Sequence, residues 1–268
     1  MARIILIETS TALCSVALSV DGEVVASRED ESRAHASLTT PFVKEVLDSQ
    51  GLTVASCDAV CVSMGPGSYT GLRVGVSTAK GLCFGAGLQL IAISSLETLA
   101  WQAPSIQDFC ALQAPSLQSL GAEGGLGQWK YIIPMIDARR MEVYTCVYSS
   151  DIQQLTKIES KVIDSDSFAS ELAAGPVLFI GDGAEKCKGV IGCQSEDSVI
   201  SATESTASPN LPASYSANAH FLQCCPKASS MAKAAEAAFA ASRFENLAYF
   251  EPFYLKDFVA TVPRRKLF

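Results

Sequence analysis

The sequence predicts an α/β protein of two domains, in which mixed sheets are flanked by helices, and three observations lead to this prediction. Continuous aliphatic runs such as residues 3–8 are typical of central strands, and they alternate with helical spacing such as that of residues 70–85. Asp21-Gly22 stands between two strand-like segments and predicts a tight hairpin. The stretch 102–128 is rich in glycine and also holds prolines, which predicts a domain boundary.

The first hundred residues predict the element order β-β-β-α-β-α-β. We expect strands at 3–8, 14–20, 23–29, 58–64 and 88–93, helices at 38–48 and 70–85, and a short helix that ends at Trp101. Ser94 or Ser95 would cap that short helix, and Pro41 either takes the first helical position or kinks its helix. A hairpin meander followed by alternating parallel units is the ribonuclease-H-like pattern, which actin, hexokinase and the Hsp70 ATPase domain share.

The second half predicts a similar order and therefore an internal duplication. We expect strands at 131–136, 142–148, 152–163 and 177–180, and a helix near 166–173. An Ala-rich helix is expected over 228–244. We predict a first domain of residues 1–103 plus about 226–268, with a C-terminal arm, and a smaller second domain of about 104–225 that contains a Ser-rich loop at 192–219.

Composition and charge restrict the classes of function. The formal net charge of −8 disfavours direct binding of nucleic acid, and the basic cluster Arg264-Arg265-Lys266 is expected to be a solvated tail. No apolar run is long enough to span a membrane, and residues 4–7 are too short for a signal-peptide core. The ten cysteines include no Cys-x-x-Cys pair. We therefore expect a reduced, cytoplasmic protein.

The Gly-rich turn 65–71 follows one predicted strand and precedes the helix 70–85, which is the arrangement of a phosphate cradle. It lacks the Gly-Lys-Ser/Thr of a P-loop, and the alternative is a tight turn with a closely packed helix. Two other turns, 8–11 and 181–184, resemble the phosphate and adenosine turns of actin-like ATPases. The candidate nucleotide-binding residues are Thr9, Ser10, Thr11, Gly65, Gly67, Ser68, Asp137, Gly181, Asp182 and Gly183.

The second phosphate turn of such a site falls on residues 136–142, which contain no glycine. A Cβ atom keeps the backbone away from phosphates, so this nucleotide site is expected to be degenerate. Asp137 and Arg139 would contact either a ligand or a neighbouring domain, or form a surface ion pair. The sequence contains only two histidines: His35, expected to cap a helix or face solvent, and His220, expected in the loop. It therefore predicts no metal site and no catalytic residue.

The predicted helix 70–85 is apolar almost all round, so both of its sides should be covered. One side can pack on its own sheet, and the other is expected either at a subunit interface or beneath the second domain or the C-terminal arm. The candidate interface residues, taken from this helix and from 38–47, are Leu38, Phe42, Val46, Gly71, Val74, Gly75, Thr78 and Leu82.

Three motifs together resemble the TsaB family of tRNA threonylcarbamoyladenosine biosynthesis proteins. These motifs are Glu8-Thr9-Ser10-Thr11 with Ser15-Val16-Ala17-Leu18, the block from Gly65 to Arg73, and Ile136-Asp137-Ala138-Arg139-Arg140. The ending Pro252-Phe253-Tyr254-Leu255-Lys256 is also similar to that family, whereas the loops at 105–128 and 192–222 are longer, with their role open. The resemblance implies an actin-like (ASKHA) fold.

The resemblance also implies partners. It implies a non-catalytic subunit that activates a TsaD-type catalytic subunit, beside a TsaE-type ATPase, with tRNA reached only through the complex. In the family, helices matching 36–48 and 70–85 form the homodimer or TsaD interface. ATP or ADP at a subunit junction stays open as a cofactor. The alternatives are a stand-alone actin-like ATPase or small-molecule kinase, and a peptidase, for which no nucleophile–base pair or metal set is present in the sequence.

Overall fold

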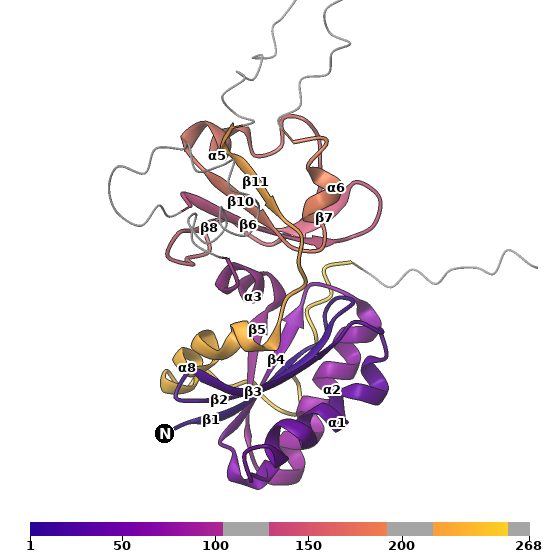
Figure 1. Ribbon diagram of the computed structural model, residues 1–268, viewed down its shortest axis with the longest axis vertical. Coiled ribbons are helices and arrows are strands. Elements are labelled where there is room, and N and C mark those ends of the chain that lie inside the picture. The colour runs from indigo at the N-terminus through magenta and orange to yellow at the C-terminus, as the bar shows by residue number, and fades with distance from the viewer. Residues whose placement is uncertain (104–128, 192–216, 257–268) are drawn as a thin grey trace, which may run out of the picture.

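The computed structural model describes residues 1–103, 129–191 and 217–256, and these form two sheets stacked one above the other in Figure 1. The lower sheet contains β1 (Arg3–Glu8), β2 (Cys14–Val20), β3 (Glu23–Asp30), β4 (Ala59–Gly65) and β5 (Gln89–Ser94). Its helices are α1 (His35–Asp48), α2 (Tyr69–Ala86), α3 (Ser95–Trp101) and α8 (Ala232–Ala240), with the 3-10 turns η1 (Val54–Ser56) and η4 (Ala228–Met231).

The upper sheet repeats the topology of the lower one. It contains β6 (Tyr131–Asp137), β7 (Glu142–Thr145), β8 (Tyr148–Ser149), β9 (Glu159–Val162), β10 (Val177–Ile180) and β11 (Ala219–Leu222), with helices α5 (Ala169–Ala174) and α6 (Ala184–Cys187). The strand orders are β3-β2-β1-β4-β5 and β9-β7-β6-β10-β11, with the first three strands antiparallel and the last two parallel in each. The duplication expected from the sequence is therefore confirmed, as is the α/β fold of two mixed sheets flanked by helices.

The lower sheet is covered on both faces, which explains the unbroken aliphatic run of β1. Ile4 and Leu6 pack under η4 and α8, whereas the alternate residues Ile5 and Ile7 face α1 and α2. The hairpin after β2 turns through Asp21 and Gly22, whose φ angles of 50° and 78° are those of the tight turn expected from an Asp-Gly pair. Ser94 accepts the Leu96 N–H and caps α3, which settles the alternative left open by the sequence.

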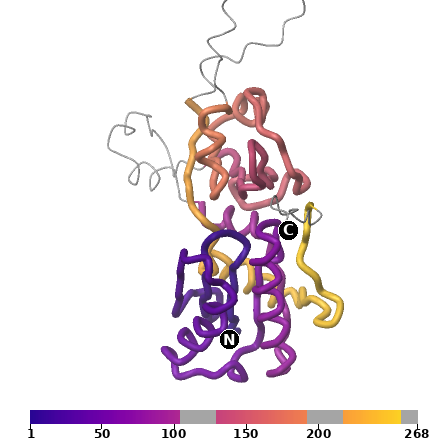
Figure 2. The backbone as a smooth tube through the Cα atoms, turned by 90° about the vertical axis from the view of Figure 1, so that its right-hand side faces the viewer, coloured from indigo at the N-terminus to yellow at the C-terminus, as the bar shows by residue number. Residues whose placement is uncertain are grey.

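Helix α3 lies between the two sheets (Figure 1). Leu96 and Leu99 pack in one buried cluster with Ile132 of β6 and Leu178 of β10. The chain returns from β11 to the lower sheet through η4 and α8, and Figure 2 shows the segment after α8 rising along α2 towards the upper sheet. The proposed domain boundaries near 103 and 225 stay a prediction.

Several expected element bounds were wrong. Helix α1 begins at His35, so Pro41 lies inside it, and His35 is buried where we expected a cap or an exposed residue. The expected strand 142–148 is divided into β7 and β8. Of the expected strand 152–163, only Glu159–Val162 forms a strand, and Gln154 makes an isolated bridge with Tyr148. In these short segments, tertiary contacts rather than the alternation of apolar and polar residues determine where the strands begin and end.

The Ala-rich pattern at 228–244 forms η4 and then α8, which ends at Ala240, and His220 lies on β11 rather than in a loop. Residues 192–216 of the predicted loop, the linker 104–128 and the basic cluster 264–266 lie outside the described residues. Within the described ranges, no helix is long and apolar enough to cross a membrane.

Candidate functional site

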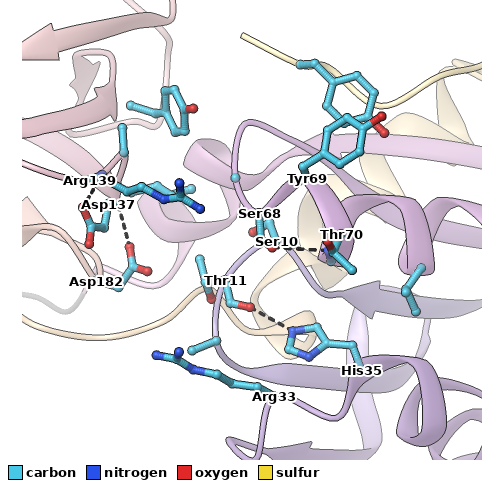
Figure 3. Close-up of a pocket in the computed structure, with 18 of the residues that line it drawn as sticks. Ser10, Thr11, Arg33, His35, Ser68, Tyr69, Thr70, Asp137, Arg139 and Asp182 are labelled. Carbon is cyan, nitrogen blue, oxygen red and sulfur yellow. Dashed lines mark hydrogen bonds between the residues drawn. The ribbon is translucent and has the colours of Figure 1, made fainter. Parts of the chain in front are cut away.

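A cleft of about 950 Å³ opens between the two sheets, where the turn after β1, the starts of α1 and α2, the turn after β6 and the C-terminal arm meet (Figure 3). Six of the ten candidate nucleotide-binding residues line it. These are Ser10, Thr11, Gly67, Ser68, Asp137 and Asp182. The other four, Thr9, Gly65, Gly181 and Gly183, do not.

The turn after β1 is built around the buried carboxylate of Glu8. Its Oε1 atom accepts hydrogen bonds from the Ser10 N–H at 2.7 Å and from Ser63 Oγ at 2.8 Å, whereas Oε2 has no hydrogen-bond partner. Burial raises the pKa of Glu8 to about 7, although Ser10 and Ser63 oppose that shift. The carboxyl group orders the turn from within and does not face the cleft.

Thr9, predicted to bind nucleotide, instead joins this turn to α2. Its Oγ1 donates to the Gly71 carbonyl oxygen at 2.8 Å. A Cβ atom on Gly71 would stand 2.0 Å from the Thr9 carbonyl oxygen, and one on Gly75 would stand 2.3 Å from Thr9 Oγ1. These glycines are therefore required by close packing inside the lower half, which corrects their assignment to a partner interface.

The Gly-rich turn packs on the same segment. The Ser68 N–H donates to the Ser10 carbonyl oxygen at 2.6 Å, and a Cβ atom on Gly67 would stand 2.3 Å from that oxygen. Gly65 has a φ of 108°, and a Cβ there would stand 2.8 Å from the Phe253 carbonyl oxygen. Gly65 and Gly67 are therefore required by close packing against carbonyl oxygens of this chain, as the tight-turn alternative expects, and Gly67 and Ser68 also line the cleft.

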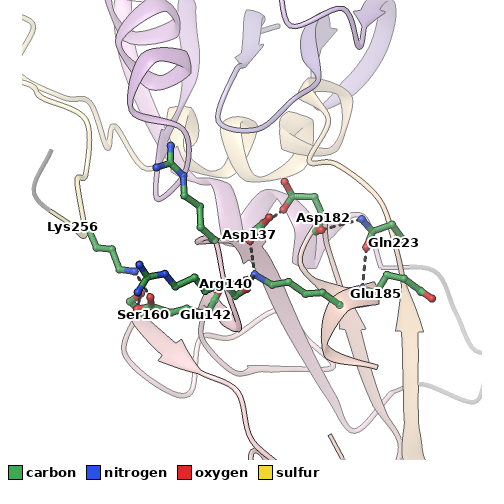
Figure 4. Close-up of polar contacts among 10 residues, drawn as sticks. Asp137, Arg140, Glu142, Ser160, Asp182, Glu185, Gln223 and Lys256 are labelled. Carbon is green, nitrogen blue, oxygen red and sulfur yellow. Dashed lines mark hydrogen bonds and ion pairs between the residues drawn. The ribbon is translucent and has the colours of Figure 1, made fainter. Parts of the chain in front are cut away.

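The turn after β6 is bound by a lysine that comes from α6. Lys186 Nζ of α6 pairs with the Asp137 carboxylate and donates to the carbonyl oxygens of Arg140 at 2.9 Å and Glu142 at 2.7 Å. The Arg139 N–H donates to Asp137 Oδ1 at 2.8 Å. Figure 4 shows this turn beside Asp182. The ammonium group thus fixes the turn and neutralises Asp137.

The third predicted turn also packs internally. Gly181 has a φ of 138°, and a Cβ there would stand 2.1 Å from the Met135 carbonyl oxygen. A Cβ on Gly183 would stand 2.9 Å from Val143 Cγ1. Asp182 Oδ1 accepts the Asp137 N–H at 2.9 Å, and burial, followed by the nearby charge of Asp137, raises the pKa of Asp182. Gly181 and Gly183 therefore hold α6 close to β6 rather than presenting backbone to a ligand.

Other residues of the cleft were missed from the sequence. The C-terminal arm closes one side of it: the Phe253 N–H donates to the Met64 carbonyl oxygen at 2.7 Å, and Tyr254 lies against Tyr69 with ring centroids 4.6 Å apart. Arg33 and Lys256 also line the cleft. Arg33 lies in no local motif. Phe253, Tyr254 and Lys256 belong to the family-like ending 252–256, but only the tertiary structure brings that ending to the cleft.

His35, at the start of α1, anchors that helix to the β1–β2 turn. Its Nε2 lies 2.8 Å from the Thr11 carbonyl oxygen, and the ring is buried. This partner explains why a histidine stands at a buried position, and it makes His35 part of the frame of the cleft. Within the described ranges, His, Cys, Asp and Glu side chains do not gather in groups of three that could hold a metal ion.

The predicted interface residues divide into two groups. Val46, Gly71 and Gly75 are buried in the lower half itself, which corrects their assignment to an interface. The remaining five are half-buried; these are Leu38, Phe42, Val74, Thr78 and Leu82. On the outer side of α2, Phe84 is 84% exposed, and no atom of the residues that the structure describes lies within 4 Å of a Cβ atom placed on Gly81 or Gly85.

Two duplicated ribonuclease-H-like sheets with a cleft between them define the actin-like class of α/β proteins. Residues 23–264 match the model of the TsaD family, described as tRNA N6-adenosine threonylcarbamoyltransferase. The chain is 35% identical to TsaB, a tRNA threonylcarbamoyladenosine biosynthesis protein of Escherichia coli, over 149 residues that cover 56% of each chain. The chain therefore belongs to the TsaD family and, within it, to the TsaB proteins.

Two further similarities agree with this. TsaB of Haemophilus influenzae is 36% identical over 138 residues, which cover 52% of this chain and 50% of that protein. A crystal structure from Pseudomonas aeruginosa, of an uncharacterized protein with similarity to peptidase YeaZ, superposes with a TM-score of 0.70 at 22% identity and covers 96% of this chain and 100% of that one. The match spans about half the length of the first two curated relatives, and the crystal structure establishes the fold alone.

Proposed function

We propose that this protein is a non-catalytic subunit that supports the addition of threonylcarbamoyl to tRNA by binding a TsaD-type catalytic subunit. The observation that carries the proposal is the packing of the three candidate nucleotide turns. Gly67 packs against the Ser10 carbonyl oxygen, and Gly181 packs against the Met135 carbonyl oxygen. Lys186 binds the carbonyl oxygens of the turn after β6, so all three turns make their close contacts within this chain. The reaction named in the proposal is taken from the names of the TsaB and TsaD relatives.

We further propose that the partner binds the outer side of α2 and the neighbouring part of α1. Glycine lowers helix stability, by about 1 kcal/mol relative to alanine, and no neighbour among the described residues requires Gly81 or Gly85. They stand four residues apart, on one face of the helix. Together with the exposed Phe84, they would let a second backbone approach α2 closely.

Phe84→Asp tests this interface. The Phe84 side chain is 84% exposed, so its replacement should leave the fold intact while it places a charge in the proposed contact. We expect loss of the one-to-one complex with purified TsaD from the same source, measured by size-exclusion chromatography with light scattering. Val162→Asp, at a residue that is 67% exposed on β9, is the matched control. If Phe84→Asp associates as the unchanged protein does, the proposed surface is wrong.

The choice of partner is tested in the same experiment. A homodimer on the same α2 face would appear as a concentration-dependent dimer of the free protein that Phe84→Asp abolishes. Binding of a TsaE-type ATPase or of tRNA should require the TsaD-type subunit. Binding of either one to the isolated chain would contradict the proposal that TsaD is the direct partner.

The second candidate function is a stand-alone ATPase or small-molecule kinase, which the cleft itself favours because it has the size of a ligand site. We expect the isolated chain to release no phosphate from ATP above the buffer rate, because its glycine turns are filled. Sustained turnover that is abolished by substitution of Asp137 would favour the ATPase and overturn the non-catalytic proposal.

A further inference from the structure

We propose that the cleft binds a small phosphate-bearing anion, held by the side chains of Arg33 and Arg139 rather than by a glycine-rich loop. Arg33 lies in the turn between β3 and α1, and Arg139 lies in the turn between β6 and β7, so the two halves of the protein contribute one arginine each. This site is independent of the partner surface on α2 and requires no ATP hydrolysis.

The two arginines are free to take a ligand. Among the residues that the structure describes, neither guanidinium group has a hydrogen-bond or ion-pair partner. Figure 3 shows both side chains extending into the space that Thr11 and Asp182 also border. A guanidinium group offers paired N–H donors that match a phosphate, and it is weakly hydrated compared with an ammonium group. Two such groups from opposite sides of a cleft can therefore clamp one dianion.

The backbone holds both arginines in an uncommon conformation. Arg33 has a φ of 62° and Arg139 a φ of 70°, in the left-handed region that bulky residues rarely occupy. Asp137 and Lys186 hold the turn of Arg139, as described above, and the contact of His35 with Thr11 fixes the start of α1 beside Arg33. The backbone positions of the two arginines are thus set by the surrounding structure before any ligand enters.

Two hydroxyl groups on the wall of the cleft lack partners. Ser10 Oγ and Thr11 Oγ1 are buried, with the residues 1% and 6% exposed, and neither has a hydrogen-bond partner. They lie near the Glu8 carboxyl and the Cys225 thiol, respectively, without the geometry of a hydrogen bond. Both oxygens are buried behind the surface of the cleft, so they can donate to a phosphate oxygen only after their side chains rotate towards it.

Two of the three carboxylates that line the cleft are already paired with lysines. Asp137 is paired with Lys186, and Glu142 is paired with Lys256. Asp182 is engaged by the Asp137 N–H, as described above. Arg140 adds a third guanidinium to the lining, in a protein whose formal net charge is −8. A cleft lined by unpaired arginines in an acidic protein focuses a positive potential where anions are otherwise repelled.

The size of the cleft limits the ligand. A volume of about 950 Å³ is that of a small-molecule site and accommodates a nucleotide or a smaller phosphate ester. Because the glycine turns are filled by the chain itself, the phosphate groups would be recognised by side chains. The chemistry shared by the candidate ligands is a dianionic phosphate or diphosphate, free or carried by a nucleoside.

Isothermal titration calorimetry of the full chain without added metal, at low ionic strength, tests the site with pyrophosphate and ADP as probes. We expect a dissociation constant in the micromolar range for at least one probe. We expect Arg33→Asn and Arg139→Asn each to weaken it at least tenfold, since asparagine tolerates the left-handed region. Equal binding of both probes would assign the site to the diphosphate, and a preference for ADP would assign it to a nucleotide.

Arg28→Asn is the matched control, because Arg28 lies on β3 in an exposed ion pair with Glu45 and outside the cleft. The proposal is overturned if neither probe binds, or if the two cleft variants bind within twofold of the unchanged protein. It is also overturned if Arg28→Asn weakens binding as strongly as they do. Should an asparagine variant fail to fold by circular dichroism, Arg33→Lys and Arg139→Lys retain the charge but lose the paired donors, and we expect an intermediate loss.

A nucleic-acid source of the same phosphate chemistry is distinguished by a short single-stranded RNA. If the RNA binds more tightly than pyrophosphate and ADP, and the two arginine variants abolish that binding, the cleft is an RNA contact and the small-ligand proposal is wrong. If RNA binds weakly, or independently of both arginines, the assignment to a small anion stands.

Discussion

At the residue scale, Glu8 is the clearest case of a side chain whose chemistry is set by burial. Its carboxylate is fully buried, its Oε2 atom has no partner, and its pKa is about 7. The folded state therefore binds a proton more tightly than the unfolded chain, so the stabilising contribution is complete at low pH and is lost as the pH rises towards 7. A rise from 4.5 to about 7 corresponds to roughly 3 kcal/mol.

Glu8→Gln should remove that dependence, because an amide of the same shape carries no charge. We expect the variant to gain stability relative to the unchanged protein by up to about 3 kcal/mol between pH 5 and pH 8. The measurement is the free energy of unfolding in urea at both pH values. A difference between the two proteins that stays constant with pH would show that the buried carboxyl group does not titrate in this window.

At the element scale, α2 contains two kinds of glycine that the sequence alone does not distinguish. A Cβ on Gly71 would stand 2.0 Å from the Thr9 carbonyl oxygen, whereas a Cβ on Gly81 meets nothing within 4 Å. We expect Gly71→Ala to destabilise the protein by about 1–3 kcal/mol through overpacking. Gly81→Ala should stabilise it by about 0.5–1 kcal/mol through helix propensity. Thermal unfolding of both variants checks the pair, and equal shifts would contradict the packing described for Thr9.

The C-terminal arm is the second element with a testable role. Tyr254 lies against Tyr69, and Lys256 pairs with Glu142 on the other side of the cleft. Tyr254→Ala should release the arm more than Lys256→Ala, because a partly exposed ion pair contributes only about 0–1 kcal/mol. Faster cleavage near residue 254 under limited proteolysis would report the release. A larger effect of Lys256→Ala would make the ion pair the main attachment.

At the scale of the whole molecule, α3 couples the two halves. Leu99 is fully buried, and it shares a cluster with Ile132 and Leu178 of the upper sheet while its helix continues directly from β5 of the lower one. Leu99→Ala should cost about 2–5 kcal/mol by leaving a cavity at this junction. We expect scanning calorimetry to record a lower transition temperature. A cost below about 1 kcal/mol would mean that the halves do not depend on this contact.

Much of the architecture follows from local patterns. The aliphatic run of β1, the Asp21-Gly22 turn and the cap at Ser94 each depend on neighbours in the chain, and each was predicted. The short strands of the upper half were predicted less well. Strand β9 pairs over only four residues, and its limits depend on β7 rather than on its own sequence.

The candidate site was predicted only in part, because the fold decides which residues from distant parts of the chain lie close together in the cleft. Ser10 and Asp137 could be named from their turns, and both line the cleft. Arg33 carries no motif, and nothing in the sequence brings it opposite Arg139. We assigned Gly67 and Gly181 to a ligand site because a glycine allows another group to approach its backbone closely. The sequence does not show whether that group belongs to a ligand or to the chain itself.

The sequence by itself determined the element order of the first half, the similar order that begins the second half and the absence of a glycine from the second turn, because these depend on spacing and residue type. The tertiary structure decided what fills each close approach. It packed Ser68 against Ser10 and bound the turn after β6 through Lys186. Among the described residues, it left the guanidinium groups of Arg33 and Arg139 without a hydrogen-bond or ion-pair partner. The physical reason is that a glycine or a charged residue in the sequence shows only which contacts are possible at its position. The packing of the folded chain determines which atom makes the contact.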